Sequence, residues 1–150
     1  NAQGAAAEPL PLWTSPRTRA RALAQAVAQH PPAGLNPPLQ VDERLAEMDF
    51  GTWELQRWDS VPPSAFDAWM ADFAHHRFGG AESTQELIDR VADALDALRD
   101  SALREAVWVT HAGVIRAAQF VATHGRGPIV GVAQWPKDAP GTGGHLCLTF

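Results

Sequence analysis

Twice in this chain, a run of residues typical of a buried strand passes almost directly into a helical pattern. AVWVT at 106–110 precedes GVIRAAQFVATH at 113–124, which Gly125 is placed to close. LPLWT at 10–14 precedes the helical pattern of residues 18–30. Strands that alternate with helices predict an α/β fold, a three-layer sandwich with a mainly parallel central sheet.

Capping signals predict where two of the helices begin. Ser15 is a suitable N-cap and Pro16 fits a first helical position, so Ser15-Pro16 predicts the start of the first helix. Ser83 and Glu86 have the spacing of a capping box. The apolar residues that follow lie on one helical stripe: Leu87, Val91, Leu95 and Leu98.

The rest of the chain predicts shorter elements within a single domain of residues 1–150. We expect a Pro-rich connection at 31–38, a strand at 39–45, a loop at 46–63, a helix at 65–76 capped by Ser64, a break at Gly79-Gly80, a surface loop at 127–144 and a final strand at 145–150.

Composition excludes several classes of function. A net charge of −5 argues against a general nucleic-acid surface, and no apolar run is long enough to span a membrane. The first residues do not resemble a signal peptide. Cys147 is the only cysteine, which excludes an intrachain disulfide and predicts a small core residue in a reducing, cytoplasmic protein.

The sequence predicts neither a metal nor a cofactor. The five histidines other than His111 show no ligand spacing, and there is no Gly-rich phosphate loop. We interpret those histidines as surface or packing residues, and the six tryptophans as anchors of the core and loops.

The two strand-to-helix turns are candidates for an anion site. In an open α/β sheet, ligands bind beyond the carboxyl ends of the strands, where helix N-termini offer free N–H groups. Ser15, Arg19 and His111 lie in these turns. Arg19 could bind phosphate oxygens and His111 could donate a further hydrogen bond. The alternatives are a solvated helix face for Arg19 and a structural role for His111.

The segment LAEMDFGTWE at 45–54 adds acidic side chains. Leu45 and Phe50 can anchor this loop, which leaves Glu47, Asp49 and Glu54 to face solvent or a pocket. A carboxylic acid beside a phosphate could protonate a leaving oxygen. The alternative is an ordinary acidic loop.

Four ordered motifs resemble the histidine phosphatase superfamily, whose fold is that of phosphoglycerate mutase. They are Ser-x-x-x-Arg-Ala at 15–20, Leu-x-Glu with Phe-Gly and Trp-Glu at 45–54, Gly-Gly-x-Glu-Ser at 79–83, and His-Ala-Gly-Val-Ile-Arg at 111–116. The segment 58–83 is similar to that of the α-ribazole-5′-phosphate phosphatases of cobalamin biosynthesis. Two positions depart from the pattern, since Leu55 replaces a Gly and Ala81 interrupts the glycine run.

The resemblance implies a cytoplasmic phosphomonoesterase that acts on a small phosphate ester. Exposed apolar edges and the Trp-rich loop are compatible with a homodimer. Arg19 and Ser15 would belong to the phosphate site, His111 would stabilise the phosphoryl charge, and Glu47 would be the proton donor. Trp53, Glu54, Glu82 and Ser83 would belong to a substrate loop. No metal or other cofactor is implied.

The family's nucleophile is a different His, in an Arg-His-Gly motif on the first strand, and that motif does not occur in these 150 residues. We therefore expect a preceding segment to supply both the motif and a central strand of the sheet. The alternatives are a non-catalytic protein that binds phosphate ligands and a phosphoglycerate mutase.

Overall fold

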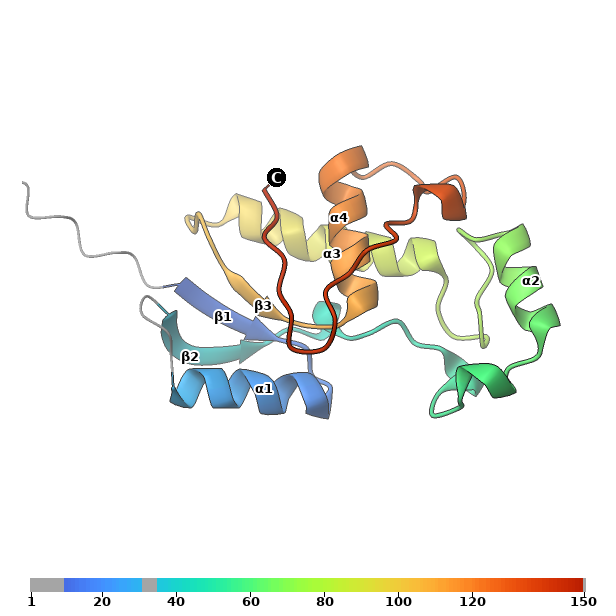
Figure 1. Ribbon diagram of the computed structural model, residues 1–150. Coiled ribbons are helices and arrows are strands. Elements are labelled where there is room, and N and C mark those ends of the chain that lie inside the picture. Colours follow the sequence, from blue (N-terminus) through green and yellow to red (C-terminus); the bar gives the residue numbers. More distant parts are fainter. Residues whose placement is uncertain (1–9, 31–34, 150) are drawn as a thin grey trace, which may run out of the picture.

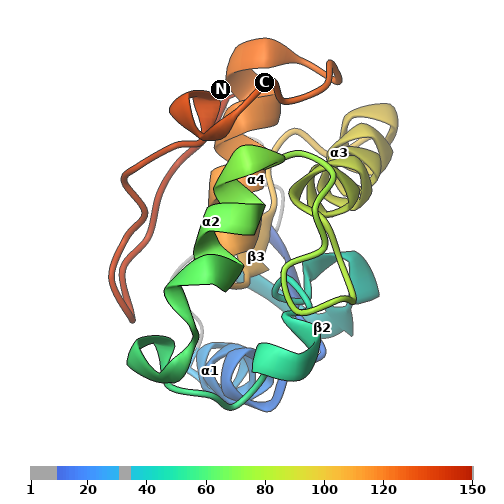
Figure 2. The ribbon, with the colours of Figure 1, turned by 90° about the vertical axis from the view of Figure 1, so that its right-hand side faces the viewer.

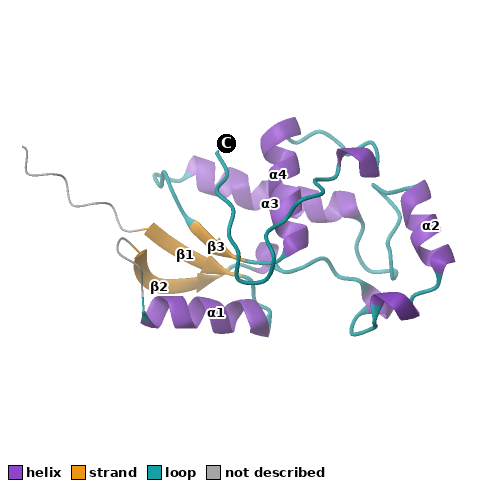
Figure 3. Cartoon of the chain, viewed as in Figure 1, coloured by secondary structure: helices purple, strands orange, loops and turns teal. Residues whose placement is uncertain are grey.

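Within the described residues the sheet has three parallel strands, and the strand at residues 10–14 lies at its centre. The computed structural model describes residues 10–30 and 35–149, of which 35–38 are described in the backbone only. Strand β1 (Leu10–Thr14) lies between β2 (Leu35–Val41) and β3 (Val107–Val109). All three strand arrows point towards the same end of the molecule (Figures 1 and 3). The predicted parallel α/β architecture is therefore confirmed.

Strand β2 begins earlier and ends earlier than predicted. Residues 35–38, expected to be part of a connection, belong to the strand, and residues 31–34 lie outside the described chain. Prolines are tolerated here because β2 borders the sheet and its register with β1 shifts between Pro11 and Leu12. After Val41, the Asp42 carboxylate accepts a hydrogen bond from the backbone N–H of Arg44 and starts a 3-10 turn instead of a longer strand.

Helices cover both faces of the sheet. Helix α1 (Thr18–Gln29) lies on one face, and α3 (Thr84–Asp100) and α4 (Ala112–His124) lie on the other (Figure 1). Successive side chains of a strand point to opposite faces. Trp13 accordingly packs against the main core between α3 and α4, whereas its neighbour Leu12 is buried outside that cluster.

Helix α3 follows its predicted pattern. The hydroxyl of Ser83 accepts a hydrogen bond from the backbone N–H of Glu86, as a capping box requires. The predicted apolar stripe faces the core, with Leu87, Val91 and Leu95 almost fully buried.

Helix α2 (Pro63–Ala71) lies beyond the carboxyl end of the sheet, together with 3-10 turns at Gly51–Trp53 and Trp58–Ser60 (Figures 1 and 2). The helix starts at Pro63, so Ser64 is not its cap. Proline suits this first position because it has no N–H to leave unpaired. The helix is also shorter than predicted, since it ends at Ala71.

The C-terminal segment departs most clearly from the prediction. Residues 145–149 form no strand, and Cys147 is exposed instead of buried. Leu148 packs against the core, whereas His145 and Leu146 are exposed, and none of the described strands pairs with residues 145–149. Within the described residues, no helix is long and apolar enough to cross a bilayer.

Candidate active site

The ends of β1 and β3 meet and bring Ser15 next to His111. The backbone N–H of Ser15 donates to the carbonyl of Val109 at 2.9 Å, which extends the pairing of these strands by one residue. The Ser15 hydroxyl is 2.8 Å from Nε2 of His111, and Ser15 is completely buried. This hydrogen bond sets the plane of the imidazole at the start of α4.

Ser15 does not cap α1 as predicted, because the helix begins at Thr18 with Arg17 in the N-cap position. Instead, the Ser15 hydroxyl accepts a hydrogen bond from the backbone N–H of Arg17 at 3.1 Å. One hydroxyl therefore contacts both the turn before α1 and the histidine before α4. The arrangement joins the two predicted anion-binding turns.

A cavity of about 940 Å³ opens at these two turns. Arg19 lines it from the start of α1, His111 from the start of α4, and Glu47 from the loop after β2. Trp53 and Glu54 of the expected substrate loop also line it. Arg19 and His111, which are 92 positions apart in the sequence (19 and 111), thus share one cavity.

The electrostatic surroundings of His111 favour its neutral form. Burial lowers the pKa of its imidazole below the usual value, and the positive charges of Arg19, Arg17 and Arg90 lower it further. The negative charge of Glu47 acts in the opposite direction. Because Arg17 and Arg19 line the same cavity as His111, an anion bound there would be attracted by both guanidinium groups.

Glu47 is held by two backbone amides. The N–H of Met48 donates to its Oε1 at 2.9 Å, and the N–H of Gly113 donates to its Oε2 at 3.3 Å. A Cβ at position 113 would overlap Oε1 of Glu47. Glycine is therefore required at 113 for the close approach of this carboxyl group to the start of α4.

Two motifs that are separate in the sequence interlock behind Trp53 and Glu54. A Cβ on Gly51 would overlap the carbonyl of Gly79, and a Cβ on Gly79 would overlap the carbonyl of Phe50. Both glycines have positive φ values, of 53° and 86°. The N–H of Thr52 donates to the Gly79 carbonyl at 3.0 Å, so the two loops form one unit.

Leu55 lies in the left-handed region with a φ of 61°, and its side chain is fully exposed at the cavity. This conformation suits glycine, the residue that the resemblance implies at this position. Leu55 adopts this left-handed conformation at a cost in free energy that glycine would not have.

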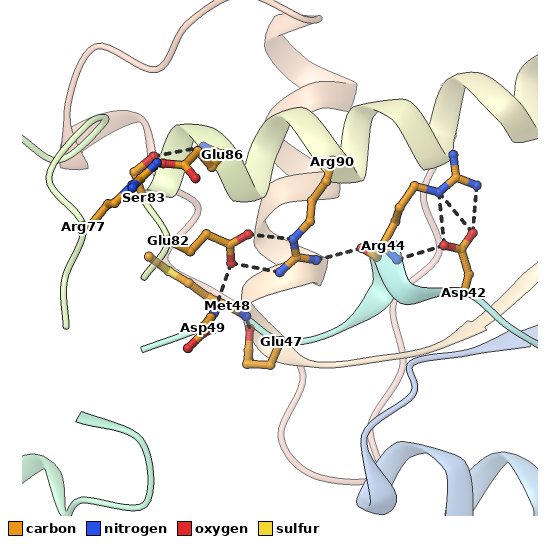
Figure 4. Close-up of polar contacts among 10 residues, drawn as sticks. All are labelled: Asp42, Arg44, Glu47, Met48, Asp49, Arg77, Glu82, Ser83, Glu86 and Arg90. Carbon is orange, nitrogen blue, oxygen red and sulfur yellow. Dashed lines mark hydrogen bonds and ion pairs between the residues drawn. The ribbon is translucent and has the colours of Figure 1, made fainter. Parts of the chain in front are cut away.

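Glu82 and Ser83, also expected in the substrate loop, do not line the cavity. Ser83 is buried and caps α3. Glu82 accepts hydrogen bonds from the guanidinium of Arg90 and from the backbone N–H of Asp49 (Figure 4).

Some cavity residues were missed by sequence reasoning. Arg17 and Arg116 line the cavity from the same strand-to-helix motifs as Arg19 and His111. Their place within those motifs was the available signal. The tryptophans interpreted only as anchors also contribute walls, namely Trp58, Trp69 and Trp135.

No three His, Cys, Asp or Glu side chains of the described chain come together in a way that could hold a metal ion. What the cavity offers is a cluster of arginines, a histidine whose pKa is lowered and an oriented carboxyl group. This combination can bind an anionic group and exchange a proton beside it.

Several proteins that are similar to this chain are named as phosphatases. A protein of Hydrogenobacter thermophilus named "Putative phosphoserine phosphatase 2" is 29% identical over 109 residues, which are 71% of this chain and 52% of that protein. A mycobacterial glucosyl-3-phosphoglycerate phosphatase, solved with inorganic phosphate, is 28% identical with a TM-score of 0.62 over 76% of this chain and 58% of its own. 

A third solved structure, from Escherichia coli K-12, is described as a "putative alpha-ribazole-5'-P phosphatase". It is 24% identical with a TM-score of 0.56, over 79% of this chain and 58% of its own, and at this identity it shows a shared fold alone.

The chain spans about half the length of the curated relative and under two thirds of these solved structures. The family model described as "Histidine phosphatase superfamily (branch 1)" matches residues 3–127, which is most of the chain. Together with the shared fold, this match identifies the chain as a member of the histidine phosphatase superfamily.

Proposed function

We propose that the protein to which this chain belongs is a phosphomonoesterase that hydrolyses a small phosphate ester. The observation that carries the proposal is the convergence of Arg19, Glu47 and His111 on one cavity at the carboxyl end of the sheet. Names of the related proteins support a phosphatase more than a mutase.

Each of the three side chains has a role in this proposal. Arg19 binds the phosphoryl oxygens, and its charge and planar fork suit that group. His111 donates a hydrogen bond to the same group and stabilises its charge in the transition state. Glu47 donates a proton to the leaving oxygen as the P–O bond breaks.

The family resemblance implies that the attacking group is a histidine of an Arg-His-Gly motif, which these 150 residues do not contain. Its ring nitrogen would form a bond to phosphorus while the ester oxygen leaves with the proton from Glu47. Water would then attack phosphorus and pass a proton to the Glu47 carboxylate while the P–N bond breaks, which releases inorganic phosphate and restores both the histidine and the proton on Glu47. In this scheme the present chain supplies phosphate binding and proton donation.

α-Ribazole 5′-phosphate is the candidate substrate that the sequence resemblance of segment 58–83 favours. Aromatic walls of the cavity support an ester with a planar apolar part, since flat rings can stack on them. These walls are contributed by Phe50, Trp53, Trp58, Trp69 and Trp135. The proposal includes the predicted cytoplasmic location of the protein. A homodimer is likewise a prediction from the sequence.

The test is turnover by the full-length protein, measured as phosphate release from an alkyl phosphate and from α-ribazole 5′-phosphate. His111→Ala and Arg19→Ala should each lose most of the activity. Matched controls are His124→Ala and Arg21→Ala, which change exposed residues that do not line the cavity. Unchanged turnover in the His111 and Arg19 variants would refute their roles.

The absence of an Arg-His-Gly motif favours a second candidate, a protein that binds phosphate ligands without turnover. Calorimetric titration with inorganic phosphate separates the two. Binding that depends on Arg19, without phosphate release from any ester, would establish the binder. Phosphate release by the full-length protein would exclude it.

A further inference from the structure

We propose that Glu82 and Arg90 act as a positioning pair for Glu47, holding the loop that carries this carboxyl group at the distance proton donation requires. The inference rests on the proposed function of Glu47. It gives a role to two residues that lie outside the cavity lining.

The segment that needs positioning is 46–50, which has no regular secondary structure. Its backbone is therefore not held by a strand ladder or by helical hydrogen bonds. Two core side chains, Leu45 and Met48, anchor it, and the Thr110 hydroxyl donates to the carbonyl of Leu45 at 2.6 Å. Apolar anchoring alone is non-directional and leaves the peptide groups free to tilt.

The ion pair supplies directional contacts on both sides of Glu47. Arg90 donates two hydrogen bonds to Glu82, at 2.8 and 3.0 Å, and a third from Nη1 to the carbonyl of Arg44 at 2.8 Å. Glu82 in turn accepts from the backbone N–H of Asp49 at 3.0 Å. The pair is thus hydrogen-bonded to the backbone at Arg44, three residues before Glu47, and at Asp49, two residues after it (Figure 4).

Both members of the pair are well shielded from solvent, with side-chain exposures of 22% for Arg90 and 14% for Glu82. A two-pronged guanidinium–carboxylate contact fixes both distance and angle. Since Arg90 projects from α3 and Glu82 precedes its cap, the loop is tied to the helix that forms the main core. A shift of this pair would move Glu47 relative to Gly113 and His111.

A neighbouring ion pair provides a matched control. Arg77 also donates through Nε to a glutamate, Glu86, at 2.7 Å, but this pair is more exposed and makes no hydrogen bond or ion pair with residues 44–49 (Figure 4). Arg77→Lys and Arg90→Lys each keep a positive charge while removing the fork. A general effect of weakening a salt bridge next to α3 should appear in both variants.

The decisive experiment compares two esters in the full-length protein. An alkyl phosphate needs a proton on its leaving oxygen, whereas p-nitrophenyl phosphate releases a stable anion. Arg90→Lys should lower kcat for the alkyl ester by about tenfold or more, as misplacement of a catalytic group does. Its kcat for p-nitrophenyl phosphate and its KM values should change little, and Arg77→Lys should resemble the wild type.

Glu82→Gln is the second variant, because it keeps an acceptor for the Asp49 amide but loses the charged, two-pronged contact. It should show the same selective loss for the alkyl ester. An equal loss for both esters, or no loss for either, in both the Arg90 and the Glu82 variants would overturn the positioning role.

Amide NMR shifts give a readout that does not need turnover. The N–H groups of Met48 and Gly113 both donate to Glu47, so their proton shifts report where its carboxyl group lies. Both signals should move in Arg90→Lys, in the direction seen for Glu47→Ala, and should stay in place in Arg77→Lys. If the wild type hydrolyses neither ester, the proposed function fails, and unchanged shifts in Arg90→Lys would then overturn the positioning role separately.

Discussion

The two walls of the cavity are built in different ways. The sheet wall, residues 14–19 and 109–113, is fixed by strand pairing and by helix starts, and Thr14 and Ser15 are completely buried. The loop wall, residues 50–58, has 3-10 turns and exposed side chains such as Leu55 and Trp58. In the proposed function, the sheet wall binds the phosphate common to all esters, and the loop wall contacts the part that distinguishes them.

The strongest test of this comparison is Phe78→Ala. Phe78 is fully buried, and its ring neighbours are Phe50, Trp53, Trp58, Phe66 and Trp69. Its loss should cost about 3–5 kcal/mol in the unit that contains the loop wall. Hydrogen exchange should accelerate at 50–80 more than in α3 and α4.

The control for Phe78→Ala is Phe120→Ala, which opens a similar void in the main core below α4. That variant should lose protection throughout the sheet wall as well. Equal acceleration in both regions of the Phe78 variant would show that the two walls unfold as one unit.

Gly113→Ala should separate stability from activity. Alanine favours a helix over glycine by about 1 kcal/mol, so the melting temperature should hold or rise. Its Cβ would displace the Glu47 carboxyl group, and turnover of an alkyl phosphate should fall by about 100-fold. Gly131→Ala, where a Cβ meets open space, is the control. Full activity of Gly113→Ala would show that turnover does not depend on the close approach of the Glu47 carboxyl group to position 113.

Sequence reasoning predicted the sheet wall better than the loop wall. Strand-to-helix turns are local patterns, and the carboxyl ends of parallel strands must meet, so Arg19 and His111 could be placed together from the sequence. The interlock of Gly51 with Gly79 and the hydrogen bond from the Asp49 amide to Glu82 are contacts between segments that lie far apart in the sequence. No local periodicity encodes such contacts. For the same reason, the sequence wrongly predicted a strand at residues 145–149.

The pH response of His111 should sharpen the same comparison. Because burial lowers its pKa in the folded protein, the unfolded chain binds the proton more readily. Its contribution to stability is present above the ordinary value of 6.5 and is lost as the pH falls from there through the folded pKa. NMR titration of the imidazole should show this lowered pKa, and inorganic phosphate should raise it.

A pKa of His111 at or above 6.5 without ligand would contradict the proposed burial effect. If added phosphate leaves the pKa of His111 unchanged, the anion binds away from the sheet wall. His124, which is exposed beside Phe120, serves as an internal control in the same spectra because it should not respond to phosphate.

Leu55→Gly should have the smallest effect. It relieves a left-handed leucine, although glycine also loses more backbone entropy on folding, so we expect a net gain of about 0.5–1 kcal/mol at most. Urea unfolding measures this change, and Gln56→Gly is the control, where only a loss is expected. A clear destabilisation by Leu55→Gly would mean that the exposed leucine makes a stabilising contact.

The interlock of Gly51 and Gly79 has a consequence for how this protein can change over time. A side chain at either glycine would overlap the backbone of the other loop, so neither loop can be exchanged alone. Insertions or substitutions that alter one loop are expected to be accompanied by changes in the other. In an alignment of relatives, positions 50–52 and 79–81 should therefore vary together, and a designer who transplants a new specificity loop should move both segments as one cassette.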